Sequence, residues 1–192
     1  MKSDLSSPSA SIHDNRDKGI KMITQSELKF IINYDHESGE FTWRNPHKQG
    51  PAKVGAKAGT IKWCGSIGSK RPYLYIHFGR KWYRAHRLAW LYMTGEWPND
   101  QIDHINTDTL DNRFCNLRQA TQRQNNYNQN LNSKNTSGVK GVSWDKTRNL
   151  WMARTKIDGK AVNLGRFSTI EAAEKKVREA REKWHKEFHN HG

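Results

Sequence analysis

Four polar residues within positions 101–130 have types and spacing that could support hydrolytic chemistry. Asp103 and His104 are adjacent, and Asn116 lies thirteen positions after Asp103. Asn125 follows nine positions after Asn116. A carboxylate and an amide oxygen are hard ligands suited to Mg²⁺, and a histidine can accept a proton near neutral pH. Hydrolysis of a phosphodiester needs both functions, because the cation neutralises developing charge and the base activates water.

Short elements must position these residues, and the local pattern predicts a strand, a loop, a second strand and a helix. A Thr-x-x-Gln capping box from Thr121 to Gln124 predicts the start of the helix and places Asn125 just past its first turn. The alternative is an Asp-His turn on the surface, followed by a polar, Asn-rich helix. The whole set at this spacing favours a nuclease site over that alternative.

The stretch resembles the HNH endonucleases, and specifically the phage-type homing endonucleases of that family. The matching residues are Asp103-His104, Leu110-Asp111-Asn112-Arg113, Asn116-Leu117-Arg118, Thr121 and Asn125. The resemblance implies a ββα-metal fold in which Asp103 and Asn125 bind one divalent ion, Mg²⁺ or Mn²⁺. It also implies that His104 is the general base and that Asn116 braces the loop that orients His104. The last family position is often His, whereas this chain has Asn125, as some homing members do.

The composition indicates a folded protein with a polyanionic partner. The 192 residues include 33 Lys and Arg against 19 Asp and Glu, which gives a formal net charge of +14. The 8 Trp residues argue against a disordered basic chain, so a folded DNA-binding protein fits best. A ribosomal or other RNA-binding protein would carry similar charge, but it would not account for the Asp, His and Asn set.

Cysteine usage and hydropathy limit the kind of site and the compartment. Cys64 and Cys115 belong to no C-x-x-C pair, which disfavours both a zinc-stapled variant and a disulfide framework. No run approaches the roughly 18 apolar residues of a membrane span, and the N-terminus lacks the apolar core of a signal peptide. We therefore expect no membrane association and a location in the reducing cytoplasm, that of the host if the chain is phage-encoded.

Residues 24–127 are expected to form an HNH endonuclease domain, preceded by a disordered tail over residues 1–23. The expected elements are a helix from Thr24, strands at 40–43 and 59–64, a hairpin at 73–84, and a helix at 86–94 closed by Gly95. The loop at 45–59 contains His47 and Lys48 and is basic enough for phosphate contact, although a solvated loop fits equally well. His86 is expected to pack or cap its helix rather than to catalyse.

A linker over residues 128–137 and a second domain over residues 138–188 are expected to follow. The expected elements are strands at 138–144, 150–157 and 160–164, an Asp158-Gly159 hairpin turn, and a helix from a capping box at 168–171 to about residue 188. One face of this helix is apolar and should cover the sheet; it consists of Ile170, Ala173, Val177, Ala180 and Trp184.

The second domain resembles the APETALA/ethylene-response-factor (ERF) DNA-binding domain. The resemblance rests on Lys140-Gly141-Val142, Trp144, Trp151, Ala153-Arg154, Asn163-Leu164-Gly165, Phe167 and Glu171-Ala172-Ala173. It implies a sheet that lies in the major groove and contacts DNA through Lys140, Ser143, Trp151, Arg154, Lys156 and Asn163. The plant domain has Trp where this chain has Asn163, so its base preference does not transfer.

The sequence therefore predicts an α+β protein, in which a ββα-metal HNH module precedes a three-stranded antiparallel sheet packed on one helix. The predicted function is metal-dependent cleavage of double-stranded DNA. We expect a monomer that nicks one strand, because the chain has one set of site residues and no heptad pattern for a dimer seam. The alternative is a non-catalytic DNA-binding regulator on a retained nuclease scaffold.

Overall fold

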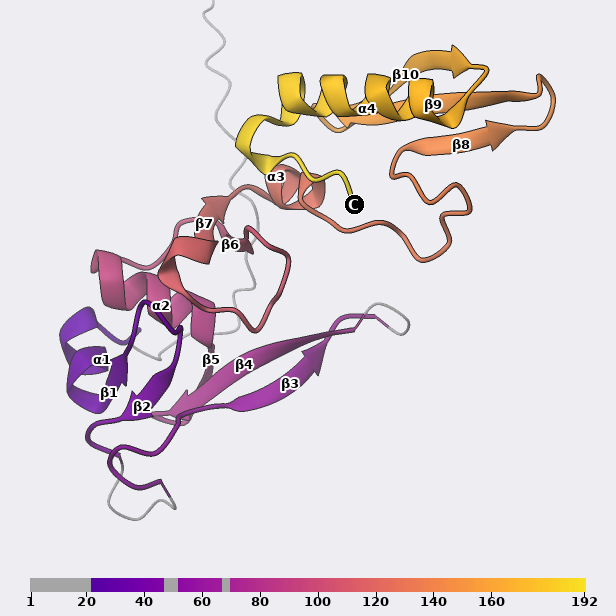
Figure 1. The fold of residues 1–192 in the computed structure, drawn as a ribbon. Helices are drawn as coiled ribbons and strands as arrows, with labels where there is room; N and C mark the ends of the chain where they lie inside the picture. The colour runs from indigo at the N-terminus through magenta and orange to yellow at the C-terminus, as the bar shows by residue number, and fades with distance from the viewer. Residues whose placement is uncertain (1–21, 47–51, 67–69) are drawn as a thin grey trace, which may run out of the picture.

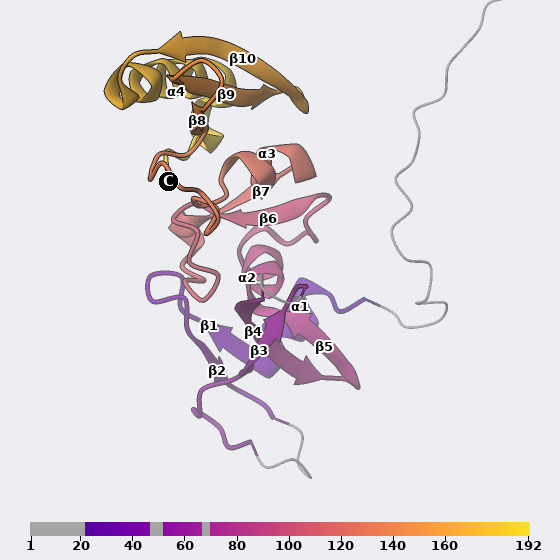
Figure 2. The same ribbon diagram turned by 90° about the vertical axis from the view of Figure 1, so that its right-hand side faces the viewer.

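The computed structural model describes residues 22–46, 52–66 and 70–192. An N-terminal body and a C-terminal unit flank the motif of residues 101–127, which lies between them (Figure 2). The expected N-terminal tail, apart from its last residues, lies outside the described residues, as do His47 and Lys48 of the basic loop. Within the described ranges, no helix combines the length and apolar character that crossing a membrane requires.

In its described residues, the N-terminal body contains two helices and five short strands (Figure 1). Its elements are α1 (Gln25–Ile31), β1 (Ile32–Tyr34), β2 (Phe41–Trp43), β3 (Thr60–Cys64), β4 (Arg71–Phe78), β5 (Lys81–Arg84) and α2 (Ala85–Thr94). β1 pairs with β2, and β3, β4 and β5 form an antiparallel sheet. A capping box between Thr24 and Glu27 starts α1, as predicted. Gly95 ends α2 with a φ of 86°, a left-handed conformation that glycine adopts readily.

One apolar core joins this body to the motif. Its fully buried side chains include Leu28, Ile32, Phe41, Ile76, Leu88 and Leu91. Burial of each such side chain stabilises the fold by roughly 1.5–3 kcal/mol. Ile102 and Leu117 belong to the same core, so the two motif strands are held against the N-terminal body.

The motif itself follows the predicted order of strand, loop, strand and helix. β6 (Gln101–His104) pairs antiparallel with β7 (Leu117–Ala120), and a single 3₁₀ turn (Phe114–Asn116) precedes β7. α3 (Gln122–Tyr127) follows at once, with Thr121 and Gln124 forming the predicted capping box. The short connection keeps α3 beside both strands.

The C-terminal unit is a three-stranded antiparallel sheet with one helix on one face (Figure 1). The strands are β8 (Val142–Asp145), β9 (Leu150–Ile157) and β10 (Lys160–Phe167), with β9 in the centre. α4 (Ile170–His185) covers the sheet through a small core of Val142, Ala153, Ala173 and Val177. A 3₁₀ turn (Lys186–Phe188) follows, and the chain then returns to α3.

The bounds of the strands in this unit differ from those predicted. β8 begins at Val142 rather than Gly138, because Gly138 and Gly141 adopt φ angles of 75° and 82° in a turn. β10 continues to Phe167 instead of ending at 164, since an irregularity between Asn163 and Gly165 shifts its register and lets pairing with β9 resume.

The helix of this unit also differs from the prediction at both ends. Its N-cap is Thr169 rather than Ser168, and the Thr169 side chain accepts a hydrogen bond from the backbone N–H of Ala172. Trp184 is 51% exposed and does not cover the sheet. Ala180 is buried as predicted, and Arg181 and His185 are buried beside it in the last turns of α4, so polar side chains take the place expected for Trp184.

Candidate active site

Asp103 lies at the centre of the motif in a buried ion pair. The register of β6 and β7 places Asp103 opposite Arg118. Asp103 is only 4% exposed, and its Oδ2 lies 2.9 Å from Arg118 Nε and 2.8 Å from Arg118 Nη2. Asn128 donates to both carboxylate oxygens, at 3.0 and 3.1 Å. Because a buried polar group is costly without partners, these contacts satisfy both carboxylate oxygens and hold the side chain in one position.

His104, the next residue, is 5% exposed and lies among aromatic rings. Its ring meets that of His86 edge-on, with centroids 5.1 Å apart, and lies 6.5 Å from the ring of Tyr73. Within the described residues, His104 Nε2 is buried and has no hydrogen-bond partner. Burial lowers the pKa of His104 below its ordinary value. His86 is itself 4% exposed and packs against Tyr73 and His104, which fits the packing role expected for it.

Asn116 ties together the loop that follows His104. Its Oδ1 accepts a hydrogen bond from the backbone N–H of Asn106 at 2.9 Å, and its Nδ2 donates to the carbonyl oxygen of Asp111 at 2.8 Å. Its own carbonyl oxygen accepts from the N–H of Ile105 at 2.9 Å. Asn116 therefore contacts the loop at both ends, immediately beside His104.

Helix α3 brings two asparagines to the motif strands. Asn125 donates through Nδ2 to Gln101 Oε1 at 2.6 Å, which leaves its Oδ1 as a possible ligand atom. Asn128, the C-cap of α3, is 4% exposed and also donates to the carbonyl oxygen of His104 at 2.7 Å. In this structure the amide that contacts Asp103 is that of Asn128, three residues beyond the predicted ligand.

Asp103, His104 and Asn125 line one small recess of about 40 Å³. A groove of about 830 Å³ adjoins it and shares several walls with it, including Arg71, Tyr73 and Asn125. The residues that line this groove include no carboxylate, and its charged residues are Lys70, Arg71 and Lys134. Three of the four predicted site residues are thus brought together beside a positively charged groove, while Asn116 does not line the recess and contacts the loop that follows His104.

The residues of the recess fit a divalent cation that takes few protein ligands. Mg²⁺ typically binds one or two carboxylates together with water and substrate phosphates. Asp103 offers a carboxylate and Asn125 an amide oxygen on the same recess. In residues 22–46, 52–66 and 70–192, no three His, Cys, Asp or Glu side chains gather as a metal cage. This donor set suits Mg²⁺ or Mn²⁺ rather than zinc, which prefers Cys and His ligands.

Comparison with known proteins identifies the motif region. Residues 83–127 match the HNH endonuclease family. The chain is also 37% identical over 82 residues to Protein 3.8 of Escherichia phage T7, and this alignment covers 42% of the chain and 68% of that protein. The chain belongs to the family of phage T7 Protein 3.8 and contains an HNH endonuclease domain. No solved structure is significantly similar to it.

The HNH match extends from before β6 to the end of α3 and includes all four predicted site residues, but it ends one residue before Asn128. It begins at Tyr83, so the two β4 residues that line the recess, Arg71 and Tyr73, lie before the matched segment. The N-terminal body therefore contributes part of the wall beside the HNH residues.

Beyond the HNH domain, four of the six predicted DNA contacts share the exposed face of the C-terminal sheet. Thr155 is buried under α4, so its neighbours Arg154 and Lys156 point to the opposite, exposed face. Asn163 lies directly across from Arg154 in the register of β9 and β10 and shares that face. Ser143 of β8 is exposed on the same side of the sheet, since it follows the buried first residue of that strand.

The structure places the other two predicted contacts, Trp151 and Lys140, away from this face. Trp151 packs against the core under α4, with its ring 5.0 Å from that of Trp144. Lys140 Nζ donates hydrogen bonds to three backbone carbonyl oxygens, those of Tyr127, Gln129 and Asn190. Neither side chain can reach DNA from the exposed face in this arrangement, and Lys140 instead joins the C-terminal unit to the end of α3.

Arg71, Tyr73, Arg118 and Asn128 shape the site but are not among the residues predicted for it from the sequence. In the sequence Arg118 is only one of the residues that match the motif, although its position opposite Asp103 follows once β6 and β7 are paired. Asn128 follows Asn125 by three positions, a spacing that places both on one side of a helix. Nothing in the sequence around Tyr73 indicates a role at the site, because only the tertiary fold brings β4 to the motif.

Proposed function

We propose that this protein is a metal-dependent DNA endonuclease that nicks one strand of a duplex. The observation that carries the proposal is the shared recess, where Asp103, His104 and Asn125 lie beside a groove whose charged lining residues are all basic. A carboxylate, an amide and a buried imidazole beside such a groove suit the hydrolysis of a polyanion. The HNH endonuclease match supports the same reaction class.

His104 is the proposed general base. Burial lowers its pKa, so the ring is neutral at physiological pH and can accept a proton from water. Its Nε2 has no partner within the described residues and is the atom that would take this proton. Asn116 would keep the ring in place by fixing the loop that begins at Ile105.

Asp103 and Asn125 are the proposed ligands of one divalent ion, Mg²⁺ or Mn²⁺. When bound, the ion neutralises the charge that develops on the scissile phosphate. Arg118 and Asn128 hold the Asp103 carboxylate in position. Arg71, which lines both the recess and the groove, would attract the DNA backbone toward the site.

The C-terminal unit is the proposed DNA reader, similar to an APETALA/ERF domain, and residues 138–188 would form it after a linker at 128–137. The exposed face of its sheet supports this proposal, because Arg154 and Lys156 supply positive charge and Ser143 and Asn163 supply hydrogen-bonding groups. Phosphate contacts position a protein on DNA, whereas polar side chains in a groove can distinguish bases.

A second candidate function is DNA binding without cleavage, by a regulator that retains the nuclease fold. The ion pair between Asp103 and Arg118 favours it, because the guanidinium occupies a carboxylate oxygen that a metal ion would need. The positive groove and the sheet face would serve binding in either case.

A plasmid assay with the full-length protein separates the two functions. The endonuclease converts supercoiled plasmid to open circle in Mg²⁺ and loses this activity in EDTA, whereas the regulator gives a mobility shift without product. A parallel preparation of His104→Ala controls for contaminating nuclease. One HNH domain supplies one site, so linear product should appear late. Prompt linear product at limiting protein, with a dimeric mass on DNA, would contradict nicking by a monomer.

A further inference from the structure

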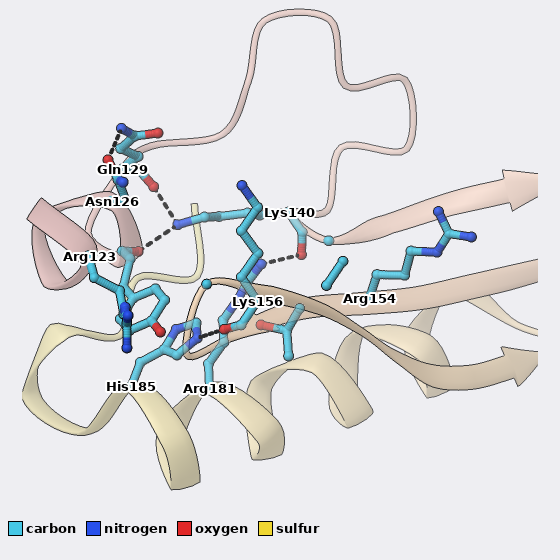
Figure 3. A pocket seen from close by; sticks show the side chains of 13 residues that line it. Arg123, Asn126, Gln129, Lys140, Arg154, Lys156, Arg181 and His185 are labelled. Carbon is cyan, nitrogen blue, oxygen red and sulfur yellow. Dashed lines mark hydrogen bonds between the residues drawn. The ribbon is translucent and has the colours of Figure 1, made fainter. Parts of the chain in front are cut away.

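A cavity of about 580 Å³ lies between α3 and the C-terminal unit, apart from the recess at Asp103 (Figure 3). Its walls come from α3, the turn before β8, the β9-β10 hairpin and α4. No carboxylate lines it, and its basic lining residues include Arg123, Lys140, Lys156 and Arg181. Arg154 also borders the cavity, but its side chain is turned away toward the exposed face of the sheet (Figure 3). Apart from Tyr127, Ala161 and two glycines, the residues that line it carry polar or charged groups.

Two of these cations are partly or fully buried without an acidic partner. Arg181 is 5% exposed and donates to the carbonyl oxygen of Lys140 at 3.0 Å. Among the described residues, neither Arg181 nor Lys140 forms a salt bridge with a carboxylate. Burial lowers the pKa of Lys140 to about 8 and that of Arg181 to about 10. Three backbone carbonyl oxygens already accept hydrogen bonds from Lys140 Nζ, but no opposite charge compensates either cation among the described residues, so an anion in the cavity would be favoured.

His185 adds an unpartnered polar atom to the same wall. It is 6% exposed, and its ring stacks on that of Tyr127 with centroids 3.8 Å apart. Its Nε2 lies 2.7 Å from the carbonyl oxygen of Lys156, and because that oxygen only accepts, Nε2 must carry the proton. Its Nδ1 is buried and has no partner within the described residues, and it would donate to an anion only when the ring takes up a second proton.

Gly141 allows these groups to approach one another. A Cβ at this position would lie 2.8 Å from Arg181 Nη2 and 2.5 Å from the carbonyl oxygen of Arg154. The φ of Gly141 is 82°, which a residue with a side chain rarely adopts. The turn before β8 thus brings its backbone against the buried guanidinium only because a glycine stands there.

We propose that this cavity binds one backbone phosphate of the DNA that occupies the neighbouring groove. Gln129 lines the recess, the groove and the cavity, and Asn126 lines both the groove and the cavity. A strand with its scissile phosphate at the recess therefore has a continuous path past the end of α3. Guanidinium and ammonium donors match the oxygens of a phosphodiester. The inference rests on the proposed function and adds an anchor shared by the HNH domain and the C-terminal unit.

The test follows phosphate binding in metal-free protein, so it needs no cleavage. Full-length protein with ¹⁵N-labelled histidine is titrated with inorganic phosphate in EDTA, and the imidazole signals of His185 are recorded by NMR. We expect phosphate to shift these signals and Lys156→Gln and Arg181→Met to weaken phosphate binding several-fold. The matched control is Arg178→Gln on the same helix, since Arg178 is paired with Glu174 outside the cavity. This control should bind phosphate as the wild type does.

A short DNA duplex supplies the second arm of the experiment. Saturating DNA should displace inorganic phosphate, because the backbone takes the same place. Phosphate that stays bound beside saturating DNA would show a site for a free anion and would overturn the proposal. So would the absence of any shift, or equal weakening by Arg178→Gln. If Arg181→Met fails to fold by circular dichroism, Lys156→Gln, with its exposed side chain, still decides the outcome. Failure of the nuclease proposal would appear separately, as absence of plasmid nicking by the wild type.

Discussion

Arg118 joins the buried carboxylate of Asp103 to the backbone oxygen of Glu187, 69 positions further along the chain. Asn128, the second partner of Asp103, is held by the same C-terminal segment, because its carbonyl oxygen accepts from Asn190 Nδ2 at 3.0 Å. Residues 186–190 therefore support both groups that position the proposed metal ligand.

Replacement of Arg118 by Met should reveal competition between its guanidinium and a divalent ion. The variant should lose about 3 kcal/mol of unfolding free energy, because Asp103 becomes a buried charge with less compensation. If Mn²⁺ binds at Asp103 in the folded state alone, as proposed, it should raise Tm more in the variant than in the wild type. Thermal unfolding with and without Mn²⁺ measures this, with Arg148→Met, which removes an exposed ion-pair partner, as the control. Equal Mn²⁺ shifts in variant and wild type would count against a metal at Asp103.

Removal of the proposed base should separate catalysis from binding. His104→Ala should lower the cleavage rate by about 10²–10⁴, the usual contribution of a general base, while DNA affinity is retained. Single-turnover nicking and fluorescence anisotropy measure the two quantities. His36→Ala, at an exposed turn, serves as the control. Cleavage by purified His104→Ala at the wild-type rate would rule out this role.

The amide of Asn125 should affect the metal requirement. Asn125→Ala should raise the Mg²⁺ concentration needed for half-maximal nicking, and Asp103→Ala should raise it further because Asp103 supplies the charge. Asn33→Ala, in an exposed position of β1, is the control for a lost amide. An unchanged Mg²⁺ titration for Asn125→Ala would mean that this residue is no ligand.

Charge on the sheet face should appear in the salt dependence of DNA binding. Arg154→Gln should reduce the slope of log K against log salt concentration by about 0.9, the value for one lost phosphate contact. Lys175→Gln, on exposed α4 away from the sheet face, should leave the slope unchanged. Anisotropy titrations in EDTA at several NaCl concentrations provide the comparison. Identical slopes for Arg154→Gln and wild type would show that the sheet face does not contact the DNA backbone.

Low pH should destabilise the protein by protonating Asp111, which lies in the loop beside the site. Hydrogen bonding from the Arg113 side chain lowers the pKa of Asp111 to about 2. Because the folded-state pKa is depressed, the stabilisation is present above the unfolded value of about 3.9 and is lost as pH falls toward about 2. With allowance for solvent screening, the loss is about 1 kcal/mol. Urea unfolding measures the free energy of unfolding at about pH 5 and at about pH 3. The loss of this free energy between the two pH values should be smaller for Asp111→Asn than for the wild type, whereas Asp100→Asn should lose as much as the wild type.

The elements that sequence predicted well are those marked by local chemistry. Capping boxes at Thr24 and Thr121 and the Asp158-Gly159 turn depend on side chains a few positions apart, so their structures could be predicted without the tertiary fold. Asp103, His104 and Asn125 were also placed at one site because a short motif carries all three. Their chemical roles remain predictions.

The parts that sequence predicted poorly depend on contacts between distant segments. Lys140 looks like any surface cation in the sequence, yet its ammonium is turned toward carbonyl oxygens of α3 and the C-terminal segment. Helical periodicity placed Trp184 over the sheet, whereas Arg181 takes the buried position because Lys140 offers it a carbonyl oxygen. Neither contact has a signal within its own stretch of sequence.

The HNH residues are synthesised well before residues 186–190, the segment that supports them. The contact from Arg118 to Glu187 spans 69 positions, so residues 103–128 are synthesised while 186–190 do not yet exist. Domains generally fold as they emerge, N-terminal parts first. A growing chain therefore carries Asp103 and His104 before Arg118 and Asn128 are anchored, and the full arrangement forms only after α4 and its final turn have docked. For the proposed endonuclease, this order delays cutting in the producing cell until the unit that reads DNA is in place.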